Sequence, residues 1–316
     1  HELAVTFAPS PLFENVTEKA IPDALTREML TRSTHEELIL ERTKTTAFED
    51  ADPRYRYFSD WESTFQFPSV SVVDIDQDAW DDLFVVDRWG ASVLLRNQGD
   101  GTFVDVSESS GLNFSESLSN CALFADFDND GDSDVLVGRT VEPSEFFRNE
   151  DGKFVADEEM NEVLRDVKFV SSGSVSDING DGLLDVYLST YCFVMNPVDE
   201  WVKYVVSEED LLKATVKIGR GHVYLDRGGP PNIVLMNSGG KLEKATVDDS
   251  LKQWHNSYQS VWTDFDEDGD PDLYVCNDFS PDAFLRNDTS RGSFAPTFTD
   301  VAAEMPAGKM GFGMGA

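Results

Sequence analysis

The chain has 316 residues, of which 60 are Asp or Glu and 25 are Lys or Arg, so its formal net charge is −35. This balance argues against nucleic acid as a partner, because proteins that bind the phosphate backbone carry basic surfaces. The sequence contains no run of about 18 apolar residues, so we expect no membrane span in this segment.

The first 64 residues precede a repeated region and form the first of two predicted parts of the chain. Phe13–Thr17 reads F-E-N-V-T and is predicted to be a strand. Residues 23–45 look helical, with a capping-box pattern from Ser33 to Glu36 ahead of Leu38–Leu40. We expect a helical hairpin packed on the rim of the second part, residues 65–316.

One acidic loop occurs four times in the second part. The copies are loop 1 (Asp74–Asp82), loop 2 (Asp126–Asp134), loop 3 (Asp177–Asp185) and loop 4 (Asp264–Asp272). Each has oxygen side chains at positions 1, 3, 5 and 9, and carboxylates this crowded repel one another unless a cation neutralises them. Ca²⁺, a hard ion that binds six to eight oxygens, fits best. The alternative is an acidic turn without metal, and four copies in register favour the metal.

The predicted ligands are the side chains at positions 1, 3, 5 and 9 and the main-chain carbonyl at position 7, giving about four Ca²⁺ per chain. They are Asp74, Asp76, Asp78, Trp80 and Asp82 in loop 1; Asp126, Asp128, Asp130, Asp132 and Asp134 in loop 2; Asp177, Asn179, Asp181, Leu183 and Asp185 in loop 3; and Asp264, Asp266, Asp268, Asp270 and Asp272 in loop 4. Because only the carbonyl is used at position 7, the side chains of Asp132 and Asp270 are expected to point to solvent. Ala79 stands where the other loops have a turn glycine, and Asn179 replaces an Asp.

The residues around the loops exclude an EF-hand. That motif needs a Glu at position 12 and a helix on each side, whereas position 12 here is Val or Leu. The flanking segments are rich in β-branched and aromatic residues, which predicts strands. Each loop is therefore a turn between two strands.

The spacing of the loops predicts the architecture. Loops 1 to 3 begin about 50 residues apart, and each unit also contains an Asn/Gly cluster of the kind that forms hairpins. One unit is thus four antiparallel strands, with the acidic loop between the first two and the Asn/Gly hairpin between the last two. Units of this kind are the blades of an all-β propeller, and about four are complete here.

The combined motif resembles a known repeat. The D-x-D-x-D-G-x-x-D loop, followed by R-N-Q-G-D-G-T-F (Arg96–Phe103), resembles the FG-GAP or VCBS-type repeat of integrin α-subunit propellers and many secreted bacterial proteins. Asp272–Asp282 and Phe103–Leu112 resemble the subgroup related to cartilage acidic protein. The resemblance covers residues 65–316 and implies a calcium-stiffened propeller that acts as an interaction module.

The same resemblance implies about seven blades in the intact ring. We therefore expect the native protein to continue beyond Ala316, with Phe13–Thr17 helping to close the last blade. The alternative is a compact four-bladed protein with frayed ends.

An insertion at about 191–231 interrupts the third unit, and it contains a predicted helix at Ser207–Lys213. In a four-strand meander this insertion lies at the end opposite the acidic loops. That face gathers Arg, His and aromatic residues: Arg88, Trp89, Arg139, Trp201, Arg220, His222, Tyr224, Arg227 and Phe279. Such residues anchor interfaces, which predicts a binding face for a protein or glycan. The alternative is that the aromatic residues pack between blades and the Arg residues offset nearby carboxylates.

Two functions from different classes follow. The first is a secreted calcium-binding recognition scaffold, located outside the cell, in the periplasm or on the cell surface, because calcium loops suit millimolar extracellular Ca²⁺. The alternative is a calcium-stabilised lyase or hydrolase of polysaccharides. The sequence has four His and no G-x-S-x-G, H-E-x-x-H or P-loop motif, which disfavours an enzyme. Of the three Cys, Cys121 and Cys276 fall in strand patterns and are predicted to be buried thiols.

Overall fold

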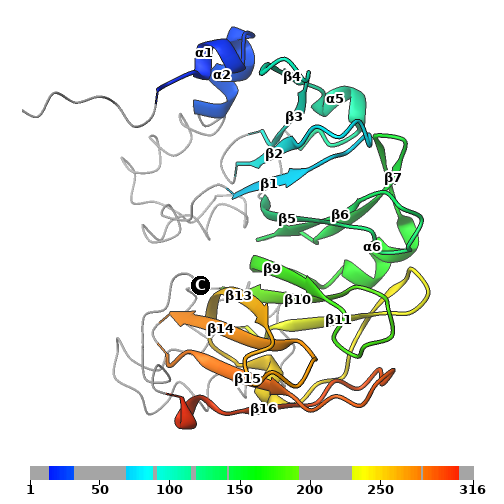
Figure 1. Ribbon diagram of the computed structural model, residues 1–316, viewed down its shortest axis with the longest axis vertical. Coiled ribbons are helices and arrows are strands. Elements are labelled where there is room, and N and C mark those ends of the chain that lie inside the picture. Colours follow the sequence, from blue (N-terminus) through cyan, green and yellow to red (C-terminus); the bar gives the residue numbers. More distant parts are fainter. Residues whose placement is uncertain are drawn as a thin grey trace, which may run out of the picture.

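Four antiparallel sheets form the body of the protein. The computed structural model describes residues 14–31, 69–87, 91–114, 119–140, 142–191, 230–278 and 280–305. Each sheet is a meander of four strands that are adjacent both in sequence and in space. Figure 1 shows the sheets following one another from β1 to β16. They are the blades of a β-propeller, so the predicted all-β class is confirmed.

The strands of the four blades have the following bounds. Blade 1 contains β1 (Ser69–Val73), β2 (Asp82–Val86), β3 (Val93–Asn97) and β4 (Phe103–Asp105). Blade 2 contains β5 (Ser119–Ala125), β6 (Asp134–Arg139), β7 (Glu145–Glu150) and β8 (Lys153–Ala156). Blade 3 contains β9 (Val170–Ser176), β10 (Asp185–Thr190), β11 (Ile233–Asn237) and β12 (Leu242–Lys244). Blade 4 contains β13 (Asn256–Thr263), β14 (Asp272–Asp278), β15 (Ala283–Asn287) and β16 (Phe298–Asp300).

A short helix follows the last strand of each blade. These helices are α5 (Ser107–Ser110), α6 (Glu158–Leu164), α8 (Asp249–Lys252) and the 3₁₀ helix η4 (Ala302–Glu304). Asp157 caps α6 by accepting from the N–H groups of Glu159 and Met160, both at 3.0 Å. Such a cap satisfies helix N–H groups that have no partner within the helix.

The N-terminal segment departs from its prediction. Residues 14–16 form no strand, and Thr17 begins α1 (Thr17–Ala20), which α2 (Ala24–Thr31) follows. The Asn15 carboxamide accepts from the Thr17 N–H at 3.0 Å. Asp105 and Asp300, which end the last strands of blades 1 and 4, likewise accept from the N–H of the residue two positions later, at 2.9 Å. The segment thus repeats the corner that ends a blade, which explains its F-x-[DN]-V signature. The predicted capping box at 33–36 lies outside the described residues.

Three apolar layers hold the blades together, one between each pair of neighbouring sheets. Phe84 and Phe147 lie in the layer between blades 1 and 2, Phe146 and Leu188 in the next, and Leu285 in the third. Burying each such side chain contributes about 1.5–3 kcal/mol. The first strands β1, β5, β9 and β13 contact one another in sequence along the row. This stacking places the four acidic loops side by side at one end of the blades.

The remaining connections fit the predicted topology. The Asn/Gly hairpins join the third and fourth strands at the same end as the acidic loops, and the insertion joins β10 to β11 at the other end. Cys121 and Cys276 are buried free thiols, as predicted. Among the helices that the structure describes, none has the length and apolar character that crossing a bilayer needs.

Candidate metal centres

The four acidic loops share one backbone shape. The fourth residue has positive φ in every loop: 57° at Gln77, 59° at Asn129, 69° at Gly180 and 63° at Glu267. The sixth residue does as well: 69° at Ala79, 101° at Gly131, 93° at Gly182 and 98° at Gly269. Glycine adopts this left-handed region without strain, whereas Ala79 adopts it at a cost. The sequence predicted the turn at the sixth position and missed the one at the fourth.

The first carboxylate of each loop closes this shape. In loop 2, Asp126 accepts from the N–H of Asp130 at 3.1 Å and from the N–H of Gly131 at 3.0 Å. The corresponding pairs in loops 1, 3 and 4 are 2.8–3.1 Å long. The fifth carboxylate in turn accepts from the N–H of the seventh residue, as Asp130 does from Asp132 at 3.1 Å. These bonds fix the orientation of the side chains at positions 1 and 5.

The converging oxygens fit a hard divalent cation. Three groups have ligand atoms within 4.8 Å of one another: Asp74, Asp76 and Asp78; Asp126, Asp128 and Asp130; and Asp264, Asp266 and Asp272. The Oδ1 atom of Asp76 is buried and has no hydrogen-bond partner among the described residues. A carboxylate oxygen left in that state is costly unless a cation binds it. The donor set is therefore suited to Ca²⁺.

Loop 3 is the neutralised variant of the same arrangement. Asn179 donates to the Asp181 carboxylate at 3.1 Å and accepts from the Asp181 N–H at 3.1 Å. Where the other loops have repulsion between the third and fifth carboxylates, loop 3 has a hydrogen bond. Removing one ligand charge is expected to weaken cation affinity at this loop.

The ninth carboxylate is buried in all four loops and ties the loop to the sheet. Asp185 accepts from the N–H of Ile178 at 2.9 Å and from the N–H of Asn237 at 2.7 Å. Burial raises the pKa of Asp134 and of Asp185 to about 6. Burial also raises the pKa of Asp82 and of Asp272. Each site thus combines a buried acid with exposed ones.

The seventh residues correct one expectation. Asp132 and Asp270 are half-buried, and the Oδ1 atom of each is shielded from solvent without a hydrogen-bond partner in the described part of the chain. Burial, together with the neighbouring carboxylates, raises the pKa of both to about 6. Trp80, at the same position of loop 1, is 51% exposed.

An asparagine at the end of each third strand has a role that the sequence did not reveal. Its backbone N–H donates to the ninth carboxylate of its own loop, and its side-chain oxygen accepts from the hairpin. Its Nδ2 group donates to the eighth carbonyl of its own loop. The four residues are Asn97, Asn149, Asn237 and Asn287. The prediction had treated them only as turn formers.

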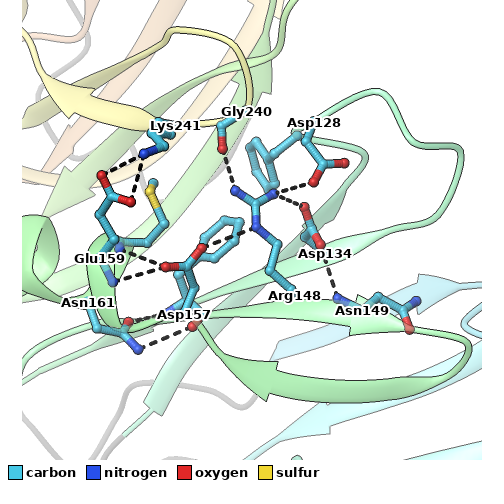
Figure 2. Close-up of polar contacts among 12 residues, drawn as sticks. Asp128, Asp134, Arg148, Asn149, Asp157, Glu159, Asn161, Gly240 and Lys241 are labelled. Atoms are coloured by element: carbon cyan, nitrogen blue, oxygen red, sulfur yellow. Dashed lines mark hydrogen bonds and ion pairs between the residues drawn. The ribbon is translucent and has the colours of Figure 1, made fainter.

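An arginine precedes this asparagine in three blades, and Arg148 of blade 2 makes the most contacts (Figure 2). Its guanidinium donates to Asp134 at 2.6 Å, to Asp128 at 3.1 Å and to Asp157 at 3.2 Å. It also donates to the carbonyl of Gly240 in blade 3. Arg148 therefore neutralises the third and ninth carboxylates of loop 2. In blade 3, the third residue of the acidic loop is the neutral amide Asn179, and the residue equivalent to Arg148 is Met236.

A cleft of about 820 Å³ lies between loops 3 and 4. The blade 4 hairpin is longer than those of blades 2 and 3, and Arg291 in it donates to the Gly180 carbonyl at 3.1 Å. The lining includes Asp177, Asn179, Asp264, Asp268, Asp270, Trp262 and Arg291. The cleft is thus lined largely by acidic loops 3 and 4.

Of the nine residues predicted for the opposite face, the structure describes Arg139 alone. Its side chain is 8% exposed, donates to Glu145 at 2.7 Å and lies over the Phe114 ring at 5.2 Å. This placement corrects the expectation that Arg139 lies on an exposed binding surface, and it matches the alternative in which Arg offsets a nearby carboxylate. Arg88, Trp89, Trp201, Arg220, His222, Tyr224, Arg227 and Phe279 lie outside the described residues.

Comparison with known proteins supports the repeat assignment. The model of the FG-GAP-like repeat matches residues 74–137 and 126–188. Cartilage acidic protein 1 of Xenopus tropicalis is 34% identical over 86 residues, which is 27% of this chain and 13% of the relative. The protein of the same name from Mus musculus is 24% identical over 208 residues, or 65% of this chain and 28% of the relative. The chain thus carries FG-GAP-like repeats and resembles cartilage acidic protein 1, of whose length it matches only a minor part.

A solved structure shows a more distant likeness. It is the structure of an Agrocybe aegerita lectin that specifically recognises non-reducing terminal N-acetylglucosamine. The TM-score is 0.42 at 14% identity, over 74% of this chain and 52% of that one. A likeness of this size carries no argument about function.

Proposed function

We propose, from the FG-GAP-like repeats that this chain carries, that it forms part of an extracellular calcium-binding propeller that serves as a recognition scaffold for a protein or glycan. The observation that carries the proposal is the repetition of one loop geometry in four blades, with clustered carboxylates in loops 1, 2 and 4. Repetition of a costly acidic cluster, with the same positive-φ turns each time, is what a shared cation site requires.

The cation's role in this proposal is structural. Side chains at positions 1, 3, 5 and 9 and the carbonyl at position 7 would hold Ca²⁺, which would neutralise the clustered carboxylates. A ligand that binds only the folded state stabilises it by RT ln(1 + [L]/Kd), about 2.7 kcal/mol per site at 100 Kd. Four such sites would stiffen one end of the propeller and leave the other end for recognition.

The extracellular setting rests on two observations. The chain has a formal net charge of −35, and the relatives it matches are named as acidic proteins of cartilage. Loops of moderate affinity fill at the millimolar Ca²⁺ found outside cells and remain largely empty in resting cytosol. The proposed partner is a protein or a glycan, because the resemblance to FG-GAP-like repeats implies an interaction module.

The experiment is a binding panel on the intact chain. Immobilised protein is exposed to matrix proteins and to neutral and acidic polysaccharides, with and without Ca²⁺. Calcium-dependent binding to one class is expected, and deletion of residues 198–228 tests whether the insertion contributes. Shortened oligosaccharides in the same incubations would replace the scaffold proposal with the polysaccharide-enzyme alternative. Absence of any calcium-dependent binding would contradict the proposal.

A further inference from the structure

The asparagine at the end of the third strand joins two consecutive metal-site loops. Besides bonding its own loop, Asn149 donates to the carbonyl of Ile75, the second residue of loop 1, at 3.0 Å. Asn237 donates to the carbonyl of Phe127 in loop 2 at 2.7 Å, and Asn287 to that of Ile178 in loop 3 at 2.9 Å. The same bond therefore recurs at all three joints between the described blades.

These bonds are shielded from water. Asn149, Asn237 and Asn287 are 5%, 0% and 3% exposed. The side chains of the residues they bond, Ile75, Phe127 and Ile178, are buried as well. A buried amide–carbonyl bond is costly to break, because neither group finds water in exchange. Each joint is consequently a defined link and not an incidental surface contact.

A second contact runs in the opposite direction at two joints. Gln77, the fourth residue of loop 1, donates to the Gly131 carbonyl of loop 2 at 2.9 Å. Asn129 of loop 2 donates to the Gly182 carbonyl of loop 3 at 3.2 Å. At the third joint Gly180 has no side chain to reach forward, and the Gly292 N–H donates back to the Asn179 carbonyl at 2.8 Å.

The bonded carbonyls lie between predicted ligands. The second carbonyl lies between ligand positions 1 and 3, and the sixth between positions 5 and 7. Ordering one loop around a cation therefore fixes the position of the carbonyls to which the neighbouring blade donates hydrogen bonds. The neighbour's asparagine is in turn held by the ninth carboxylate, a predicted ligand of the next site. Two sites that share ordered groups bind with coupled free energies.

We infer that neighbouring calcium sites of this propeller are positively coupled through Asn149, Asn237 and Asn287, which act as positioning residues for the loop of the preceding blade. The inference rests on the proposed calcium binding. It predicts that removing the cation from one loop lowers the cation affinity of the neighbouring loop by about five-fold or more, which is the lower end of typical coupling between sites. By the same linkage, a cation bound in either loop raises the cation affinity of the other loop by the same factor.

The loop 1–loop 2 joint offers a site-specific probe. Trp80 belongs to loop 1, so Tb³⁺ bound there is expected to luminesce when the indole is excited. The part of the signal that Trp80→Phe abolishes reports loop 1 alone. Loop 2 is disabled by Asp130→Ala, which removes a predicted ligand whose side chain accepts from Asp132 in its own loop and, among the described residues, makes no hydrogen bond across the joint. The apparent Tb³⁺ affinity of loop 1 is then measured with and without Asp130→Ala, in chains carrying Asn149 or Asn149→Ala.

Asn97→Ala is the matched control. It removes the same own-loop and hairpin bonds, yet among the described residues Asn97 makes no bond to another blade. Gln77→Gly is a second link variant in case Asn149→Ala fails to fold. It deletes the bond to Gly131 and leaves a glycine, which tolerates the φ of 57°.

The expected result is that Asp130→Ala lowers the apparent Tb³⁺ affinity of loop 1 at least about five-fold when Asn149 is present. The effect should fall toward one-fold in Asn149→Ala, shrink in Gln77→Gly and persist in Asn97→Ala. An unchanged loop 1 affinity in the wild-type joint would overturn the coupling. Equal weakening with and without Asn149 would overturn the assigned route. Absence of any Trp80-sensitised signal would instead remove the proposed cation site of loop 1 itself.

Discussion

Arg148 is expected to act as a substitute cation in loop 2 when calcium is absent. The substitution Arg148→Met introduces the residue that blade 3 has at the equivalent position, Met236. Arg148 contacts Asp134, which is buried, and Asp128, which is half-exposed (Figure 2). Removing the guanidinium from metal-free protein leaves these two carboxylates near each other without a counter-charge.

The magnitude follows from burial. Breaking a buried ion pair costs about 3–5 kcal/mol, and since the Arg148 side chain is 21% exposed, we expect about 2–3 kcal/mol in metal-free protein. At saturating Ca²⁺ the cation supplies the missing charge, and we expect a loss of about 1 kcal/mol from the remaining contacts with Asp157 and Gly240. By linkage, the difference of about 1–2 kcal/mol appears as roughly five- to thirty-fold tighter calcium binding at loop 2.

The assay is denaturant unfolding of both proteins, with Ca²⁺ and with chelator. Arg286→Met is the matched control, because Arg286 occupies the same position in blade 4 but is 40% exposed and pairs with Asp288 outside the loop at 3.0 Å. An exposed pair of this kind contributes about 0–1 kcal/mol, so the control should change little in either condition. Equal destabilisation of Arg148→Met with and without calcium would show that Arg148 does not act as a substitute cation.

Three further predictions follow from single residues. Ala79→Gly relieves a left-handed alanine and should stabilise the protein by about 0.5–1 kcal/mol in thermal unfolding, while Gly131→Ala, which has open space around its added methyl, should destabilise it by a similar amount. Cys121 is buried and its pKa is raised to about 12, so iodoacetamide should leave it unmodified in native protein and label it after unfolding, as peptide mass spectrometry would show. Burial raises the pKa of Asp185 from 3.8 to about 6, so this carboxyl contributes stability at low pH that is lost as the pH rises through 6. Metal-free protein should therefore melt at a lower temperature at pH 7.5 than at pH 5, and a rise in melting temperature over that interval would contradict this.

The strand order and the loops were predictable because their signals are local. Acidic positions, a turn glycine and flanking β-branched residues all fall within a dozen residues of one another, and four copies reinforce the pattern. The positive φ at the fourth loop position was missed because Gln77 and Glu267 are not residues that favour it. That conformation accompanies the bond from the fifth N–H to the first carboxylate, which spans the fourth residue in all four loops.

The missed features depend on contacts that form only when the strands and blades pack together. Asn149 is a turn residue by its local pattern, and its bond to Ile75 exists only once blade 2 packs on blade 1. Arg139 was assigned to the candidate binding face because it follows a strand at that end of blade 2, but Glu145 and the Phe114 ring enclose it. No signal within blade 2 specifies the contact of Asn149 with Ile75 or of Arg139 with Phe114, although the recurrence of Asn at the same place in four units was a usable clue.

Calorimetric calcium stoichiometry is the decisive test of whether the four acidic loops bind Ca²⁺. Metal-free protein is titrated with Ca²⁺ in a calorimeter, and wild type is compared with a chain in which Asp74, Asp126, Asp177 and Asp264 are all replaced by Asn. These first carboxylates anchor the shape of every loop. We expect about four Ca²⁺ per wild-type chain and a large loss of bound calcium in the variant. A wild-type stoichiometry near zero would contradict this expectation.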